Sequence, residues 1–295
     1  MRCPLLAIGL LWLALAPPAP AQDTRLVHGL WVWKGATVLG TARGSEQLRD
    51  FCRAQGINEV YVAVFSHGEL GEAAALASAI ALLHDGGIRV EALLSSTDAD
   101  ESGRHRDKLV AQVAAVLEFN QHHPHARIDG IHLDIEPQQR AENKGAGNLR
   151  FLPGLVAAYA AVRALAQPAG LTVNADIQNK LLKGSLQERS SLLHALPRLT
   201  LMLYELSSPT DGSSSADKAA KLRTASRSFL DMAYAGLPAT GLATMVIGLR
   251  TPDYGELLPQ MLRTLDAAHE REPHYQGWAR HSYNDTLAAA TASPH

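Results

Sequence analysis

Cysteine is scarce in this sequence, charge is balanced, and each shortage excludes a class of protein. Only 2 cysteines occur among 295 residues, too few for a disulfide scaffold. With 27 Lys and Arg against 29 Asp and Glu, the chain lacks the basic excess typical of nucleic-acid binding, so we expect no nucleic-acid partner. A hydrophobic fraction of 46% is too high for a disordered chain. The composition therefore indicates a globular protein with a large core.

Several catalytic motifs are also missing from the sequence. It contains no Ser-nucleophile elbow, no HExxH segment and no CxxC pair, so nothing supports the reaction classes that depend on them. No glycine-rich phosphate loop follows the first expected strand, which argues against an open doubly wound sheet that binds nucleotides. We therefore expect no cofactor and no bound metal.

The first 22 residues have the layout of a secretory signal peptide. Arg2 is followed by the apolar run Leu5–Ala16 and then by small residues up to Ala21. The apolar run is too short to span a bilayer, which takes roughly 20 residues. We expect a signal peptide over residues 1–21, a secreted or bacterial periplasmic location, and no stable membrane insertion after cleavage. Cys52 would then be the only remaining cysteine.

The rest of the chain alternates between short β-rich runs and longer Ala- and Leu-rich runs with helical spacing. The expected strands are Leu26–Trp33, Glu59–Phe65, Arg89–Leu94, Gly130–Glu136, Leu171–Ile177, Leu199–Tyr204, Ala243–Gly248 and Gly277–Tyr283. Eight strand–helix units without a dividing linker have the size of a closed (β/α)8 barrel of the TIM type. We therefore predict an α/β fold with one such barrel domain over residues 22–295.

The fourth expected strand carries the most informative pattern. Apolar residues alternate there with His132, Asp134 and Glu136, so these three side chains point into the barrel. Charged groups are rarely buried without partners, and two carboxylates this close on one strand shift each other's pKa. We expect Glu136, nearest the open end, to be a protonated general acid and Asp134 to stay ionised. The alternative is a buried network that only stabilises the barrel.

The fifth expected strand alternates in the same way and turns Asn174 and Asp176 toward the interior. Asp176 would bind a sugar hydroxyl or act with Glu136 as the second carboxylate of an ordinary glycosidase pair. The structural alternative is an ion pair between Asp176 and either Lys180 or Arg250.

Aromatic side chains are expected near the same open end. Trp33 ends the first strand, and its face can stack on a sugar ring. His281 and Tyr283 share a face of the eighth strand and are predicted to line the pocket. The alternative for each is ordinary packing.

Two of these segments resemble glycoside hydrolase family 18, the chitinase-like family. Its fourth barrel strand carries D-x-x-D-x-D-x-E, and here Asp129, His132, Asp134 and Glu136 occupy the four positions, with His in place of the second Asp. Its sixth strand carries Met-x-Tyr-Asp, and Met202–Glu205 reads Met-Leu-Tyr-Glu. The resemblance implies a barrel that hydrolyses an oligo- or polysaccharide with 2-acetamido sugars.

The resemblance also implies roles for individual residues. Glu136 would protonate the glycosidic oxygen, Asp134 would orient the acetamido group that attacks the anomeric carbon, and Tyr204 would support that group. We assign substrate binding to a second set of residues: His132, Asn174, Asp176, Trp33, His281 and Tyr283.

The presence of His132 where the family has its second Asp changes which groups can exchange a proton with Asp134. A neutral imidazole can hydrogen-bond Asp134, whereas a charged one would hold that residue as a carboxylate. Two alternatives therefore remain: a carbohydrate-binding barrel without catalysis, and a metal-dependent hydrolase that uses the His and carboxylates of this region as ligands.

Overall fold

The computed structural model describes residues 25–101, 103–144 and 149–286. The expected signal peptide lies outside these ranges. Within them, no helix combines the length and the apolar character that a membrane span requires.

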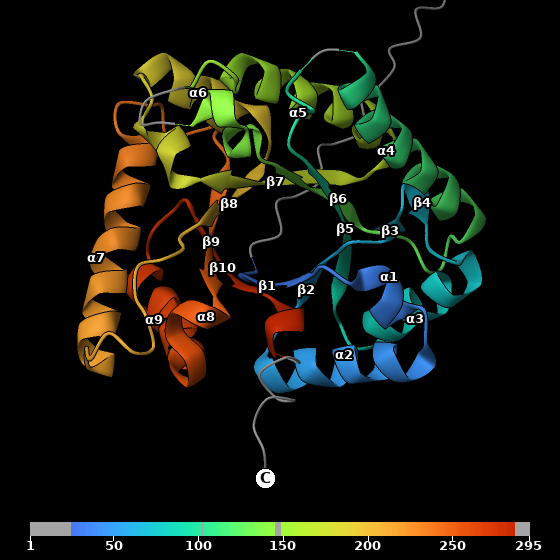
Figure 1. Ribbon diagram of the computed structural model, residues 1–295, viewed down its shortest axis with the longest axis horizontal. Coiled ribbons are helices and arrows are strands. Elements are labelled where there is room, and N and C mark those ends of the chain that lie inside the picture. Colours follow the sequence, from blue (N-terminus) through green and yellow to red (C-terminus); the bar gives the residue numbers. More distant parts are fainter. Residues whose placement is uncertain (1–24, 102, 145–148, 287–295) are drawn as a thin grey trace, which may run out of the picture.

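Eight parallel strands close into a barrel in the order β1-β10-β9-β8-β7-β6-β5-β2 (Figure 1). The barrel strands are β1 (Val27–Val32), β2 (Glu59–Val62), β5 (Arg89–Ser96), β6 (Gly130–Ile135), β7 (Thr172–Gln178), β8 (Arg198–Met202), β9 (Thr244–Arg250) and β10 (Tyr275–His281). Each of them overlaps one of the expected strands, so the predicted (β/α)8 barrel is confirmed. A small antiparallel hairpin of β3 (Phe65–Ser66) and β4 (Glu69–Leu70) was not expected.

Helices surround the barrel on its outer side (Figure 1). They are α1 (Gly35–Leu39), α2 (Ala42–Gln55), α3 (Ala73–Asp85), α4 (Arg104–His122), α5 (Leu152–Ala166), α6 (Leu186–Ala195), α7 (Ser215–Tyr234), α8 (Thr251–Tyr254) and α9 (Leu258–His269). Short 3-10 turns are η1 (Pro137–Gln139), η2 (Ala141–Asn143), η3 (Gln167–Ala169), η4 (Asn179–Lys183) and η5 (Gly255–Leu257).

Local sequence signals fix where the helices begin and end. The side chains of Ser185 and Ser214 each accept a hydrogen bond from the backbone N–H three residues later. The acidic side chains at those positions, Glu188 and Asp217, accept from the backbone N–H of the same serines. Both pairs are therefore capping boxes, and they start α6 and α7. Gly56, with φ of 67°, ends α2 in the left-handed conformation that glycine adopts without strain. The strands and helices that position the site therefore follow from local chemistry.

Two apolar cores result from the alternation of side chains along the strands. The larger core lies between the strands and the helices and contains, for example, Ile131, Leu133 and Ile135 of β6. The smaller one lies inside the barrel and consists of Val27, Trp31, Tyr61, Leu93, Val246 and Ala279. The rest of the barrel interior is polar, and it is there that the predicted site residues meet.

Candidate active site

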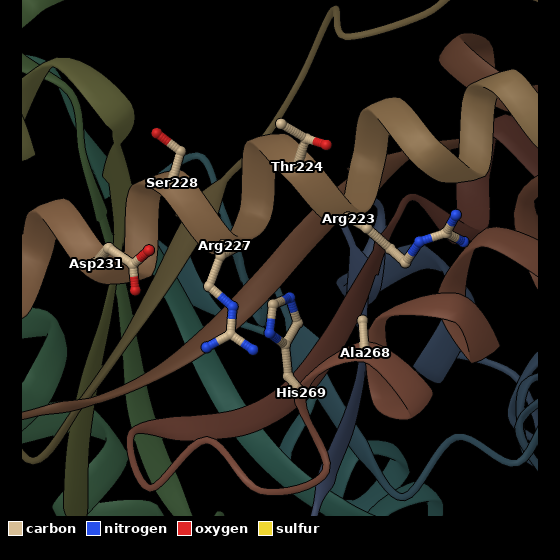
Figure 2. A pocket seen from close by; sticks show the side chains of 7 residues that line it. All are labelled: Arg223, Thr224, Arg227, Ser228, Asp231, Ala268 and His269. Carbon is tan, nitrogen blue, oxygen red and sulfur yellow. The ribbon is translucent and has the colours of Figure 1, made fainter.

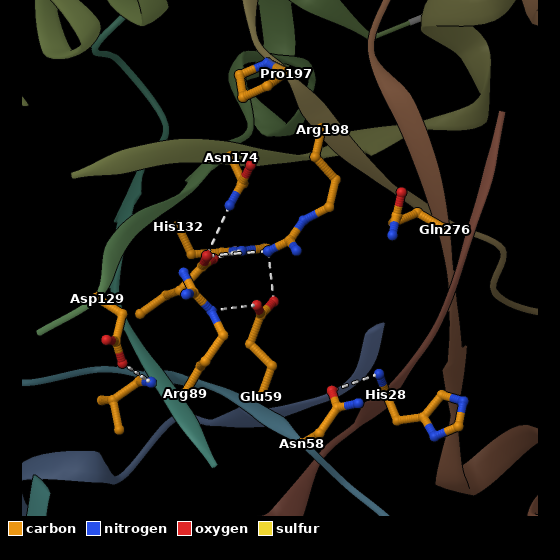
Figure 3. Close-up of polar contacts among 12 residues, drawn as sticks. His28, Asn58, Glu59, Arg89, Asp129, His132, Asn174, Pro197, Arg198 and Gln276 are labelled. Atoms are coloured by element: carbon orange, nitrogen blue, oxygen red, sulfur yellow. Dashed lines mark hydrogen bonds and ion pairs between the residues drawn. The ribbon is translucent and has the colours of Figure 1, made fainter. Parts of the chain in front are cut away.

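A network of charged side chains fills the amino-terminal end of the barrel (Figure 3). The guanidinium groups of Arg89 and Arg198 converge on the buried Glu59, with 3.4 Å between Arg89 Nε and Glu59 Oε2. Arg198 also donates to Glu91 Oε1 at 3.0 Å, and Asn174 donates to the same oxygen at 2.7 Å. Glu91 is fully buried, and Arg198 and His132 help to lower its pKa despite burial. Glu91 therefore acts as an ionised acceptor at this level of the barrel.

His132 lies above Glu91 and joins it to Asp176. Its Nδ1 is 3.1 Å from Glu91 Oε2, and its Nε2 is 2.8 Å from Asp176 Oδ1. The ring is fully buried and stacks on Tyr61 with the ring centroids 3.6 Å apart. Burial alone would lower the pKa of His132, but the two carboxylates raise it to about 9. His132 is therefore an imidazolium at neutral pH.

Asp176 is buried beside His132 and has a second donor. Trp31 donates its indole N–H to Asp176 Oδ2 at 2.9 Å. The ion pair with Lys180 or Arg250 considered from the sequence is therefore not formed, because His132 and Trp31 satisfy this carboxylate. Asn174 is occupied with Glu91, so three predicted substrate-binding residues are buried beneath the open end of the barrel rather than exposed in it.

Asp134 lies on the same strand as His132, one pleat closer to the carboxyl end, and is 7% exposed. Its Oδ1 is buried and has no hydrogen-bond partner within the described residues. Burial raises the pKa of Asp134 well above its usual value, and the negative charges of Asp176 and Glu136 add to the rise. The positive charge of His132 opposes this rise. The direction of the pKa shift runs against the expectation that Asp134 stays ionised.

Glu136 follows β6 at the carboxyl end of the barrel and is half-buried. Gln138 and Gln178 each donate to its Oε1 at 3.1 Å, and Gln139 donates to its Oε2. Burial raises the pKa of Glu136, although the glutamine side chains oppose the rise. Its position at the open end and its raised pKa agree with the predicted general acid.

Tyr204, Trp33 and His281 lie together at the carboxyl end of the barrel. The hydroxyl of Tyr204 is buried without a hydrogen-bond partner in the described residues, and its ring lies 5.6 Å from that of His281. Trp33, which is partly exposed, donates its indole N–H to His281 Nε2 at 2.8 Å. The guanidinium of Arg250 lies 5.3 Å from the Tyr204 ring centroid. The structure thus brings Trp33, Tyr204 and His281 together, and their roles in substrate binding stay predictions.

Other predicted or family-related positions lie away from the open end. Tyr283 is buried and packs on Phe51 of α2, with 5.2 Å between the two ring centroids. The expectation that Tyr283 lines the pocket is therefore corrected. Asp129, the first acid of the strand-four motif, accepts from the backbone of Val90 and contacts His84 at 2.9 Å. Asp129 therefore anchors the amino-terminal end of the barrel.

Sequence reasoning gave no site role to two groups that shape the site, Glu91 and Trp31, and it placed a third, Gln178, at the mouth without naming its partner. Glu91 and Trp31 hold the His132–Asp176 pair from neighbouring strands, and Gln178 binds Glu136. A signal for Glu91 was present, because it alternates with apolar neighbours on its strand just as His132 does.

In the described part of the chain, no group of three or more His, Cys, Asp or Glu side chains is arranged to hold a metal ion. A shallow hollow of about 580 Å³ lies outside the barrel between α7 and α9 (Figure 2). It is lined by Arg227 and His269 among others, and Arg227 pairs with Glu272 while His269 bonds Ser226. None of the predicted site residues lines this hollow.

Comparison with solved structures identifies the architecture. A family 18 N-acetylglucosaminidase from Paenibacillus barengoltzii superposes with a TM-score of 0.54 at 11% identity, covering 88% of this chain and 96% of that chain. The barrel has the fold of family 18 glycoside hydrolases. A chitinase from Bacteroides thetaiotaomicron gives a TM-score of 0.54 at 13% identity, covering 90% and 93% of the two chains. The spore cortex-lytic enzyme SleL of Bacillus cereus gives a TM-score of 0.55 at 10% identity, covering 89% of this chain and 72% of that chain.

The resemblance seen in the strand-four motif is thus confirmed at the level of the fold. Neither a protein-family model nor a curated protein matches the sequence. At these identities the solved structures establish the architecture, and the chemistry has to be argued from the site itself.

Proposed function

We propose that this protein is a glycoside hydrolase that cleaves a polysaccharide containing 2-acetamido sugars. The observation that carries the proposal is the arrangement at the end of β6. A half-buried carboxyl with a raised pKa, Glu136, lies two residues beyond a buried carboxyl, Asp134, which has an unpaired oxygen. The unpaired hydroxyl of Tyr204 lies at the same end of the barrel. Such unpaired polar atoms are costly unless a ligand satisfies them.

Each of these groups has a role in the proposed reaction. Glu136 donates a proton to the glycosidic oxygen as the bond to the anomeric carbon breaks. The carbonyl oxygen of the substrate's acetamido group attacks that carbon, and water later opens the cyclic intermediate, with Glu136 now accepting a proton. Asp134 and the Tyr204 hydroxyl hold the acetamido group in position. Trp33 and His281 bind a neighbouring sugar, with the indole face as the platform.

The site residues need no cofactor for this reaction, and we extend the proposal to location. The signal-peptide pattern of residues 1–21 supports export to the bacterial periplasm or the exterior, where structural and capsular polysaccharides occur. Nothing in the charge balance favours a nucleic-acid partner.

The test is a screen of the purified protein, lacking residues 1–21, against bacterial and structural polysaccharides and soluble 2-acetamido oligosaccharides. Products are detected by mass, in the presence and absence of a chelator. We expect shortened oligosaccharides whose formation the chelator leaves unchanged. Loss of product with the chelator would instead support the metal-dependent alternative.

One observation favours a second function, a carbohydrate-binding barrel without catalysis. The three glutamine donors around Glu136 stabilise its carboxylate form. A general acid must be protonated before it can act, so these donors oppose that role. Binding of an oligosaccharide, measured by calorimetry, with no product after long incubation would support this second function and contradict the first.

A further inference from the structure

The segment that follows Glu136 carries two of the three side chains that hold its carboxyl group. Gln138 and Gln139 belong to the 3-10 turn η1, and each donates its side-chain amide to an oxygen of Glu136. A short 3-10 turn makes few backbone hydrogen bonds, and their geometry is poorer than in an α-helix. The position of these two donors therefore depends on contacts that anchor η1 from outside.

Arg140, the residue after Gln139, makes such a contact. Its Nη1 and Nη2 donate to the two oxygens of Asp100 at 3.0 and 2.8 Å, which is the paired geometry of a guanidinium on a carboxylate. The side chain of Asp100 is 6% exposed and that of Arg140 is 18% exposed. Because both groups are largely shielded from solvent, this ion pair is held more firmly than a surface pair, which contributes little.

Asp100 is itself fixed to the helices outside the barrel. It lies in the loop after β5, and its backbone oxygen accepts from Arg106 of α4 at 3.1 Å. The same oxygen lies against Gly154 of α5, where a Cβ atom would be 2.1 Å away from it. Only glycine allows so close an approach. The Arg140–Asp100 ion pair therefore connects η1 to the packed helices α4 and α5.

The other end of η1 has a separate anchor. Asn143 is buried and donates its side-chain amide to the carbonyl oxygen of Pro137 at 2.9 Å. The carbonyl oxygen of Asn143 in turn accepts from Lys180 of η4 at 3.4 Å. These bonds hold the start of η1, whereas its end at Gln139 is held by the side chain of Arg140.

We propose that Arg140 is a positioning residue for the general acid. Its ion pair with Asp100 holds the two donors of η1 on the carboxyl group of Glu136. The guanidinium does not touch substrate, because Asp100 and Glu101 engage it, the latter at 3.0 Å. The inference rests on the proposed function, in which Glu136 gives a proton to the glycosidic oxygen. The ion pair keeps the carboxyl group oriented and, through the glutamine donors, limits the rise of its pKa.

Other charged and titratable groups near Glu136 do not replace the donors of η1. The negative charge of Asp176 raises the pKa of Glu136, and Asp134 and Glu136 repel each other when both are ionised. The phenol of Tyr204 has a pKa raised by burial and stays neutral. Lys180 is bonded to a carbonyl oxygen of η2. The hydrogen bonds from the glutamine side chains act against Asp176 and lower the pKa of Glu136.

The first test is the pH dependence of kcat/KM for Asp100→Asn on the oligosaccharide found in the screen. Asparagine offers Arg140 one acceptor oxygen in place of two and no charge, so η1 loosens and the Glu136 carboxylate loses donors. We expect the alkaline limb to move to higher pH by about one half to one unit, with a lower kcat. A negative charge that acted on Glu136 only through space would, on removal, move the limb to lower pH. The sign of the shift therefore separates the two effects.

Glu101→Gln is the matched control. It removes the same charge from the exposed side of Arg140 and leaves both bonds to Asp100 in place, so the alkaline limb should stay where it is. Arg140→Lys keeps the positive charge but loses the planar pair of donors. We expect this variant to move the limb in the same direction as Asp100→Asn, by a smaller amount.

The second test needs no substrate. Carbon-13 spectra of the glutamate carboxyl groups, assigned with Glu136→Gln, measure the pKa of Glu136 directly, and we expect it to be higher in Asp100→Asn than in the wild type. An unchanged or lower pKa in folded Asp100→Asn would overturn the proposal, as would an equal upward shift in Glu101→Gln. If Asp100→Asn does not fold, Arg140→Lys decides in its place. If the wild type cleaves nothing, the proposed function fails while the carboxyl titration still tests the ion pair.

Discussion

Trp33 donates its indole N–H to Nε2 of His281 across 2.8 Å, so this nitrogen must carry a lone pair and not a proton. Burial lowers the pKa of His281, which keeps the ring neutral at pH 7. Its Nδ1 lies 3.5 Å from Asp285, on the opposite side of the ring. The orientation of the predicted sugar platform therefore depends on a histidine that titrates.

The first prediction concerns the acid side of substrate binding. Below the lowered pKa of His281, a proton on Nε2 would face the Trp33 N–H, so Trp33 should turn away and KM should rise as the pH falls. His281→Gln supplies a carbonyl acceptor that does not titrate and should keep KM flat over the same range. A KM that rises equally in both proteins would show that Trp33 is not controlled by His281.

The second prediction is that Asp134→Asn stabilises the protein while damaging catalysis. A carboxyl whose pKa is raised by folding binds more protons in the folded state, so it lowers the stability progressively as the pH rises above its unfolded pKa of about 4. The variant should match the wild type near pH 4 and become relatively more stable above it, by at most about 1.4 kcal/mol per pH unit.

Urea unfolding at several pH values measures this difference, with Asp50→Asn on the surface as the control. A difference between Asp134→Asn and the wild type that does not grow with pH would mean that Asp134 is ionised in the folded protein.

A third prediction separates the structural base of the barrel from its open end. Arg198→Met leaves Glu59 and Glu91 buried without the cation between them, which should lower the free energy of unfolding by about 3–5 kcal/mol. Arg227→Gln, which removes an exposed ion pair with Glu272, should lower it by less than about 1 kcal/mol. Equal losses of unfolding free energy in the two variants would show that the buried ion pairs of Arg198 stabilise the protein no more than the exposed pair of Arg227 does.

Much of the fold followed from the sequence because period-2 alternation and helical spacing switch repeatedly along the chain. The elements that escaped prediction are too short to show a period: the hairpin of β3 and β4 has two residues in each strand, and α1 has five. The capping box at Ser214 also starts α7 inside the segment Ser207–Asp217, which has the small polar residues of a loop.

The sequence predicted which way side chains point along a single strand, but it did not predict the contacts that they make with side chains of neighbouring strands. Alternation placed His132, Asp134 and Glu136 inside the barrel, but the raised pKa of Asp134 comes from its burial and from Asp176 on β7. Tyr283 was assigned to the pocket by alternation, yet β10 ends at His281, so the pattern no longer applies two residues later.

The proposed role of Glu136 as the general acid of a glycosidase can be tested with one substitution. Glu136→Gln keeps the shape of the side chain and its place among the glutamine donors, but it cannot give a proton to the leaving group. With the substrate identified in the screen, kcat measured by product mass should fall by about 10²–10⁴-fold, while thermal unfolding and oligosaccharide binding stay near the wild-type values. A Glu136→Gln protein that hydrolyses the substrate at the wild-type rate would show that Glu136 is not the general acid.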